Sequence, residues 1–434
     1  MAATVLITNS IVAGRTGTEV VTEQLADGLR RAGRHPIVYA PVLGGLARAM
    51  RARGHVLVDR LDAVPIRPDV IHGQHTGPTM AALTAFPNVP AVFVSHSILA
   101  SYDRPPRHPR IRRYFAVSEL VRQRVASDGI ELDRVHLLRQ AVDLDRFRQR
   151  APLPERPRRA LALTKNTAHL GAVEEACDAA GIELDVCGPS TGRFTEHPEE
   201  LLCSSDLVFA TGRNALEAAA VGCSVVVCDA LGFAGRLTSA NADAWCRLNL
   251  AVGLQAHPTN VERLASAIAS YDPSDAARVC ATVRRDAALE AQVAELVAVY
   301  DQIRSEGPAD RGEEAAATAA FLEDYVPTQT SDRPWLRLAR DVYGELPFRE
   351  SDVVLKETQR ELLTQMNLHA ERLRSDLVAE VRALRREIGA SPAADAASIG
   401  VVEHVRCLYR RVVPARVRNP IGRARRRVLA RLTR

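Results

Sequence analysis

Short apolar segments alternate with longer amphipathic segments along the first 300 residues, and this alternation constrains the fold more than any other feature. The chain opens with a β-branched run at residues 4–8, an amphipathic stretch at 18–32 and a second apolar run at 36–40. Gly33 ends the helix between the two runs. This β-α-β opening predicts a mostly parallel sheet covered by helices.

The same alternation resumes after a proline-rich linker at residues 151–159. Further strands are expected at residues 63–66, 70–72, 91–94, 114–117 and 135–138 before the linker, and at 160–163, 183–187, 207–210 and 224–228 after it, where helices at 168–180, 198–204 and 213–221 separate them. A chain of 434 residues also exceeds what one hydrophobic core usually serves. We therefore predict an α/β fold with two Rossmann-like domains, residues 1–150 and 160–305, facing each other across a cleft.

A helical extension is expected at residues 306–400, where the sequence becomes rich in alanine and charge. Apolar residues between 354 and 388 recur at helical spacing on a charged background, which predicts one long amphipathic helix. Two roles remain open for it: a homo-oligomer contact, or packing onto the body of the same chain.

The last segment, residues 401–434, is strongly basic. It carries eleven arginines and one acid, a charge of +10 that leaves −5 for the other 400 residues. Arginine interleaved with valine and leucine suits an anionic membrane surface, at about 1 kcal/mol per basic residue. A disordered tail ranks second. Nucleic acid ranks last, because neither expected domain is basic and no aromatic pattern accompanies the arginines.

Cysteine usage and hydropathy point to the cytoplasm. The eight cysteines form no C-x-x-C pair and have no zinc-finger spacing to histidine, so we expect reduced thiols and no metal. No run of about 18 apolar residues offers a membrane span, and the N-terminus does not resemble a signal peptide. We expect a cytoplasmic protein that attaches peripherally to the inner face of the plasma membrane through the basic tail.

Several segments together resemble a known family over roughly residues 4–300. They are the glycine-bearing opening at residues 4–33, His72 and His75 at one strand end, His96 at a later strand end, residues 114–118 and 135–147, and the run 210–222 followed by 225–227. In order and spacing these segments resemble glycosyltransferase family 4, the retaining enzymes of the GT-B fold. The resemblance implies two Rossmann-like domains, a nucleoside diphosphate sugar as donor, no metal and no further cofactor.

The chain also departs from the family pattern. The family commonly has two glutamates separated by seven residues; Glu217 resembles the later one, but the earlier position, eight residues back, holds Phe209. Gln140-Ala141 replaces the usual Asn-Gly, and residues 163–167 replace the usual opening of the second domain. The chain therefore represents a divergent branch.

Two helix starts are candidate sites for the diphosphate of the donor. Gly17 lies at the first, where Thr16 and Glu19 have the spacing of a capping box; the alternative is a tight turn that binds nothing. Gly212 and Arg213 lie at the second, and the arginine fork suits a diphosphate.

Three further side chains complete the predicted site. Glu217 lies one turn after Arg213 and can accept hydrogen bonds from ribose hydroxyls; the alternative is a surface ion pair. Lys165 follows the first strand of the second domain and can contact phosphate, or it is a solvated loop residue. His96 is assigned a catalytic position as a hydrogen-bonding partner of a sugar hydroxyl, the alternative being a structural histidine.

We therefore expect a hexosyltransferase-type glycosyltransferase of polysaccharide or cell-envelope biosynthesis. The donor would bind mainly to the second domain, and the acceptor, a glycan or lipid-linked molecule, to the first. Two rivals remain: another sugar-nucleotide enzyme such as an epimerase, and a non-catalytic protein that binds partners.

Overall fold

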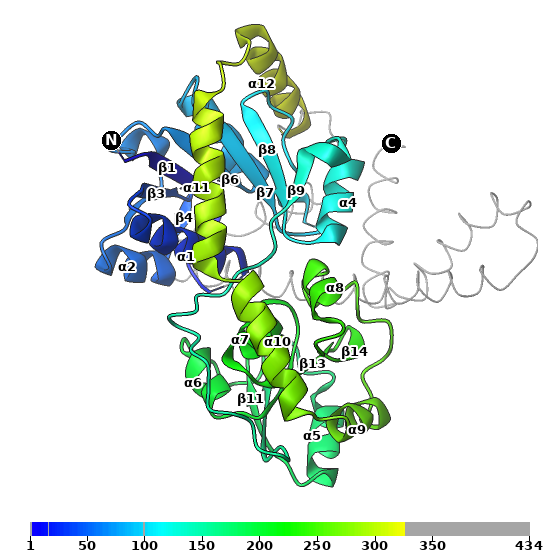
Figure 1. Cartoon of the computed structure of the whole chain (residues 1–434). Coiled ribbons are helices and arrows are strands. Elements are labelled where there is room, and N and C mark those ends of the chain that lie inside the picture. The colour runs from blue at the N-terminus through cyan, green and yellow to red at the C-terminus, as the bar shows by residue number, and fades with distance from the viewer. Residues whose placement is uncertain (1, 16, 99, 326–434) are drawn as a thin grey trace, which may run out of the picture. The chain divides into compact units, whose positions relative to one another are not determined.

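The computed structural model describes residues 2–15, 17–98 and 100–325 (Figure 1). The expected helix at 354–388, the basic tail and most of the extension from 306 to 400 lie outside the described residues. Within the described part of the chain, no helix combines the length and the apolar character needed to cross a membrane.

The first sheet has seven strands, all parallel. Their order is β5 (Val56–Val58), β3 (His35–Tyr39), β1 (Thr4–Thr8), β6 (Val70–Gln74), β7 (Ala91–Ser95), β8 (Ile111–Ala116) and β9 (Val135–Leu137). Every residue of the three strands β1, β6 and β7 is buried. Burial on both faces explains the mostly apolar sequences of β1 and β7, whereas β6 ends in His72, Gly73 and Gln74.

Helices cover this sheet. They are α1 (Gly17–Arg31), α2 (Gly45–Ala52), α3 (Thr76–Ala85) and α4 (Glu119–Ser127), and a small parallel pair, β2 (Ile11–Val12) and β4 (Val42–Leu43), lies beside them. Three single-turn helices complete the unit: η1 (Leu61–Ala63), η2 (Ser101–Asp103) and η3 (Leu132–Arg134). We call this unit the N-lobe.

The second sheet has five strands in the order β11 (Glu183–Cys187), β10 (Arg159–Leu163), β12 (Leu207–Ala210), β13 (Ser224–Asp229) and β14 (Gly232–Arg236). The first four are parallel, and β14 is antiparallel to β13. The helices of this unit, the C-lobe, are α5 (Leu170–Ala179), α6 (Pro198–Cys203), α7 (Gly212–Val221), α8 (Ala242–Arg247), α9 (Val261–Ala269) and α10 (Pro273–Asp286). The prediction of two α/β units with parallel sheets is confirmed.

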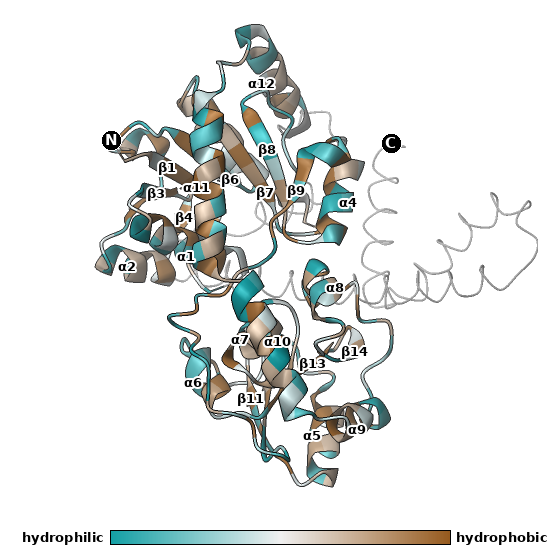
Figure 2. Cartoon of the chain, viewed as in Figure 1, coloured by the Kyte–Doolittle hydropathy of each residue, from teal (hydrophilic) through white to brown (hydrophobic). Residues whose placement is uncertain are grey.

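The cores divide differently from the predicted domain boundaries at residues 150 and 305. Helix α11 (Leu289–Ser305) belongs by sequence to the predicted second domain, yet Leu289 and Tyr300 on it are buried in the core of the N-lobe. Figure 2 shows apolar and polar residues alternating along α11, as expected for a helix with one face on a core. Conversely, Val142 and Phe147 are buried in the core of the C-lobe.

Helix α12 (Arg311–Tyr325) follows, and its Glu314 lies 2.8 Å from Nε of Arg110 in the N-lobe. Of the expected helical extension, the structure describes residues 306–325, most of which form this helix.

The strand expected at residues 63–66 is wrong. This region contains η1 and no strand, and the edge strand of the sheet is β5, seven residues earlier. Pro65 and Pro68 flank the apolar Ile66, and proline cannot donate the hydrogen bonds of a strand. Ile66 is accordingly 59% exposed.

Candidate functional site

Polar residues follow the carboxyl ends of three neighbouring strands of the N-lobe, β1, β6 and β7. In a parallel sheet these ends share one edge, where α/β proteins bind ligands. Ser10 follows β1, His75 follows β6 and His96 follows β7. The histidines singled out in the sequence are therefore gathered at one edge of the sheet.

The backbone at His96 is held by a buried carboxylate. Oδ2 of Asp103 accepts hydrogen bonds from the N–H groups of His96 and Ser97, both at 2.6 Å. Burial raises the pKa of Asp103 to about 7, although these two N–H groups and Arg124 act in the opposite direction. Arg124 also donates to the carbonyl oxygens of Ser97, Ala100 and Asp103, so the loop after β7 is tied to α4.

The imidazole of His96 is neutral at physiological pH. Burial, together with the nearby His75, His72 and Arg213, lowers its pKa to about 3. Its Nε2 atom is buried and has no hydrogen-bond partner among the described residues. A neutral ring with an unused nitrogen can donate to or accept from a ligand hydroxyl.

His72 is bound instead by another side chain of the protein. Its Nδ1 is hydrogen bonded to the hydroxyl of Tyr300 on α11, at 2.6 Å, and both residues are buried. Burial lowers the pKa of His72 to about 3 and raises the pKa of Tyr300, so this pair is neutral.

Arg213, on the first turn of α7, directs one nitrogen of its guanidinium to three acceptors, two of which lie outside its own helix. Nη1 donates to the side-chain oxygen of Gln24 on α1 at 2.7 Å, and more weakly to the carbonyl oxygen of Ala141 at 3.4 Å and to Glu217 at 3.5 Å. Nε is buried without a partner among the described residues. One edge of the guanidinium is therefore anchored, and the edge that includes Nε retains unused donor capacity.

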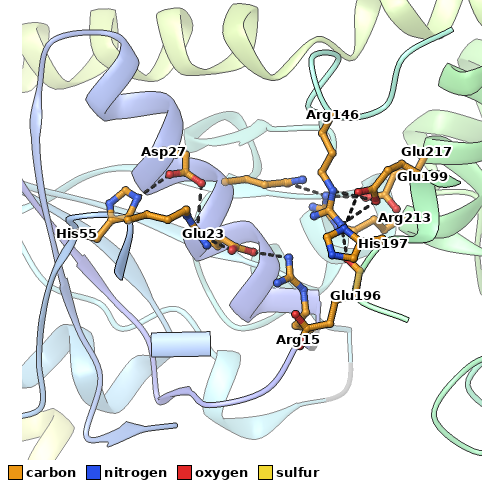
Figure 3. A network of polar contacts seen from close by, with 12 residues as sticks. Arg15, Glu23, Asp27, His55, Arg146, Glu196, His197, Glu199, Arg213 and Glu217 are labelled. Carbon is orange, nitrogen blue, oxygen red and sulfur yellow. Dashed lines mark hydrogen bonds and ion pairs between the residues drawn. The ribbon is translucent and has the colours of Figure 1, made fainter. Parts of the chain in front are cut away.

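Glu217 lies deeper than a surface ion pair would. It is 4% exposed, and burial raises the pKa of its carboxyl group against the field of Arg213 and Arg146. Figure 3 shows Arg146 and Glu199 beside Arg213 and Glu217; Arg146 donates to Oε2 of Glu199 from Nε at 3.0 Å and from Nη2 at 2.8 Å. Arg213 and Glu217 do form the i,i+4 ion pair of the alternative interpretation, at 3.5 Å, but it does not lie at the surface.

One cavity brings part of the predicted set together. Its lining includes His96, His72, Arg213, Gln24 and Gln140. Sequence reasoning missed both glutamines as site residues. Oε1 of Gln140 is buried and lacks a hydrogen-bond partner within the described chain, so this cavity contains an unused acceptor as well as unused donors.

Gly17, Gly212 and Lys165 are not among the residues that line this cavity. Gly17 begins α1, and a Cβ atom built on it would meet no atom within 4 Å. Gly212 has a φ of +59°, but its N–H donates to the carbonyl oxygen of Leu250 at 2.9 Å and is not available to an anion in this conformation. Lys165 is exposed beyond the end of β10.

The carboxylate of Glu19 holds the loop before α1. The carboxylate of Glu19 accepts hydrogen bonds from the N–H groups of Ala13 and Gly14, at 2.7 and 2.8 Å. Thr16, the other half of the expected box, lies outside the described residues. Glu19 thus fixes the glycine-bearing loop from within the first turn of the helix.

The position of the missing acidic partner is filled by apolar packing. Phe209 is fully buried in β12, where Ala162 and Val226 pair with it on the neighbouring strands. A carboxylate near the start of α7 comes from β13 instead: Oδ2 of Asp229 accepts a hydrogen bond from the hydroxyl of Thr211 at 3.2 Å. Among the described residues, no group of three or more His, Cys, Asp or Glu side chains could hold a metal ion.

Residues 15–146 match the family model described as Glycosyltransferase Family 4. The structure resembles a glycosyltransferase from Rickettsia africae ESF-5 with a TM-score of 0.52 and 15% sequence identity, over 70% of this chain and 100% of that one. It also resembles Anabaena Alr3699/HepE in complex with UDP and glucose, with a TM-score of 0.48 and 12% identity, over 69% and 99% of the two chains. No curated protein matches the sequence. The resemblance to glycosyltransferase family 4 predicted from the sequence is supported over residues 15–146, and the resemblance to the Rickettsia africae structure confirms the predicted GT-B fold.

Proposed function

We propose that this divergent, glycosyltransferase-family-4-like chain transfers a sugar from a nucleoside diphosphate sugar to an acceptor hydroxyl. The observation that carries the proposal is the shared cavity of His96 and Arg213. His96 lies at the carboxyl end of a parallel strand of the N-lobe, and Arg213 begins a helix of the C-lobe. This arrangement offers a neutral hydrogen-bonding ring and a cation to the same ligand.

Arg213 would bind the diphosphate. The charge that develops on a departing diphosphate requires donors fixed in advance, and a guanidinium anchored at Nη1 meets this requirement because its remaining N–H groups keep their direction. The dipole of α7 also favours an anion at the first turn of this helix. Thr211 makes no side-chain hydrogen bond that caps this turn. Lys165 and Gly17 remain proposed phosphate contacts at other edges of the site.

Glu217 and His96 would orient the sugar nucleotide. A ribose hydroxyl that donates to Glu217 would compete with the 3.5 Å contact to Arg213, which is long enough to be replaced at small cost. His96, held by Asp103, would hydrogen-bond a hydroxyl of the transferred sugar. Retention at the anomeric carbon, metal independence and a hexosyl donor are proposed from the family resemblance.

The acceptor is proposed to be a glycan or a lipid-linked glycan. This proposal rests on the charge of +10 in residues 401–434, which favours an anionic membrane surface. Co-sedimentation with vesicles containing anionic lipid, with and without these residues, tests the attachment. Equal binding of both forms would remove the membrane from the proposal.

Donor binding tests the proposed function. A panel of UDP-, GDP- and dTDP-sugars should include at least one that raises the melting temperature of the protein, because a ligand that binds only the folded state stabilises it. The absence of any shift would reject the enzyme proposal and favour the non-catalytic rival, which the apolar Phe209 supports. Conversion of the donor without any acceptor would favour an epimerase.

A further inference from the structure

Ser10, His75 and Tyr102 meet at the edge of the N-lobe sheet, and none of them has a role in the proposed donor site. His75 is 3% exposed, and its Nδ1 lies 3.1 Å from the backbone nitrogen and 3.0 Å from the hydroxyl oxygen of Ser10. Its ring stands perpendicular to the ring of Tyr102, with an interplanar angle of 83° and 4.8 Å between the centroids. Three separate connections after parallel strands thus converge on one imidazole.

The contact with Ser10 determines the tautomer of His75. A backbone N–H can only donate, so Nδ1 must be the acceptor and carries no proton. Burial lowers the pKa of His75 to about 4, against the field of Glu19, so the ring is neutral and its one proton lies on Nε2. Nε2 is buried and has no hydrogen-bond partner in the described part of the chain. An N–H donor is therefore fixed in place without an acceptor, which is costly unless a ligand or water supplies one.

Tyr102 supplies an aromatic surface next to this donor. Tyr102 is 59% exposed. It lies in the short helical turn η2, which hydrogen bonds connect to two other parts of the N-lobe. The hydroxyl of Thr76 donates to the carbonyl oxygen of Tyr102 at 3.0 Å. The next residue, Asp103, accepts the N–H of His96. The same turn therefore positions both the exposed ring of Tyr102 and the backbone of His96.

We propose that His75 and Tyr102 form a sugar-binding subsite on the acceptor side of the protein. The Nε2–H of His75 donates to a ring hydroxyl of the acceptor, and the ring of Tyr102 packs against an apolar face of the sugar. Binding sites for small polar molecules usually contain a few polar groups of fixed direction and an aromatic wall. The role of the bound sugar as acceptor rests on the proposed function. The binding of a sugar by His75 and Tyr102 does not depend on it.

The test uses the full chain labelled with ¹⁵N in its histidine rings. Methyl glycosides of glucose, galactose, mannose and N-acetylglucosamine are titrated one at a time, and the His75 ring signals are identified by their loss in His75→Asn. At least one glycoside should shift the Nε2–H signal of His75 saturably. Tyr102→Ala should weaken that glycoside's affinity by about fivefold or more, whereas Tyr102→Phe, which keeps the ring, should bind as the wild type does.

Two outcomes would overturn the subsite: no saturable shift of the His75 signals with any glycoside, or a shift with the same affinity in Tyr102→Ala. Because Tyr102 is exposed, its replacement should leave the fold intact, and the histidine spectrum of the variant verifies this directly. A protein that binds nucleoside diphosphate sugars but no glycoside at His75 retains the proposed function and loses this subsite. A protein that binds a glycoside but no nucleotide sugar keeps the subsite and loses the transferase.

Discussion

Nη1 of Arg213 lies 2.7 Å from the side-chain oxygen of Gln24, although 189 positions separate the two residues in the chain. The contact joins the start of α7 to the middle of α1. It fixes the direction of the guanidinium that we propose to bind the diphosphate, and it leaves Nε without a partner among the described residues.

Gln24→Met should therefore weaken donor binding even though Gln24 need not touch the donor. Methionine has nearly the same length but accepts no strong hydrogen bond, so Arg213 loses its anchor. We expect about a fivefold loss of affinity for the nucleoside diphosphate sugar, as for one lost hydrogen bond, measured by isothermal titration. An affinity equal to or higher than that of the wild type would mean that Gln24 competes with the donor instead of positioning Arg213.

Glu217 should make the protein less stable as pH rises. Its pKa in the folded state is raised above the ordinary value of 4.5 by burial, so the unfolded chain ionises first, and the free energy of unfolding falls as pH increases from about 4.5 through the folded pKa. Glu217→Gln removes this loss. The free energy of unfolding of the variant, relative to the wild type, should therefore increase across this window in urea denaturation.

Glu199→Gln is the matched control because the sign is opposite. Burial alone would raise the pKa of Glu199, but hydrogen bonds, chiefly from Arg146, hold it below its ordinary value. Its ionised form stabilises the fold, and this stability is lost as pH falls. The free energy of unfolding of the wild type, relative to that of Glu199→Gln, should therefore increase as pH rises. The same pH dependence of this free energy in Glu217→Gln and Glu199→Gln would contradict the account.

Two variants of Asp103 should separate the effect of its charge on stability from the effect of its hydrogen bonds. Its pKa, raised from 3.8 to about 7 mainly by burial, predicts that the free energy of unfolding falls between these two pH values. Asp103→Asn keeps an oxygen for the N–H groups of His96 and Ser97 and should abolish this fall. Asp103→Ala leaves both N–H groups without their acceptor and should cost about 1–3 kcal/mol for each group that stays unsatisfied.

Urea denaturation at several pH values measures both effects of Asp103. A slope that persists in Asp103→Asn would show that another group causes it. Equal stability of the Ala and Asn variants would show that the N–H groups of His96 and Ser97 do not depend on an acceptor at this position.

Two glycines of α1 should respond differently to alanine. A Cβ atom on Gly28 would lie 2.6 Å from Cγ2 of Val293 on α11, whereas one on Gly17 would meet nothing within 4 Å. We expect Gly28→Ala to lower the free energy of unfolding by about 1–3 kcal/mol because it overpacks the contact between the two helices. Gly17→Ala should not lower it. Equal values in urea denaturation would contradict the packing of α11 on the N-lobe.

Much of the architecture could be predicted because strands buried on both faces have continuous apolar sequences. The bounds predicted for β11 and β12 agree with the structure. The prolines near Ile66 explain why the strand predicted at residues 63–66 is absent. Helix α11 shows why core membership was harder to predict. Its amphipathic sequence reveals that one face is buried, but not which sheet that face will meet.

The candidate site was predictable where a side chain follows a strand or begins a helix. His96 and Arg213 were identified in this way, and the structure places both on one cavity. Gln24, Gln140 and Tyr300 carry no such signal, because a glutamine inside a helix or a tyrosine on an amphipathic face looks like any other. Tyr300 meets His72 across 228 positions, a contact that only the folded chain can reveal.

The central claim is that Arg213 binds the diphosphate of a sugar nucleotide. Isothermal titration should compare the wild type, Arg213→Lys and the exposed control Arg278→Ala with the nucleotide sugar that gives the largest thermal shift. Lysine keeps the charge but loses the planar fork, so we predict that Arg213→Lys binds at least about tenfold more weakly, while Arg278→Ala matches the wild type. Unchanged affinity in Arg213→Lys would contradict the assignment of this site.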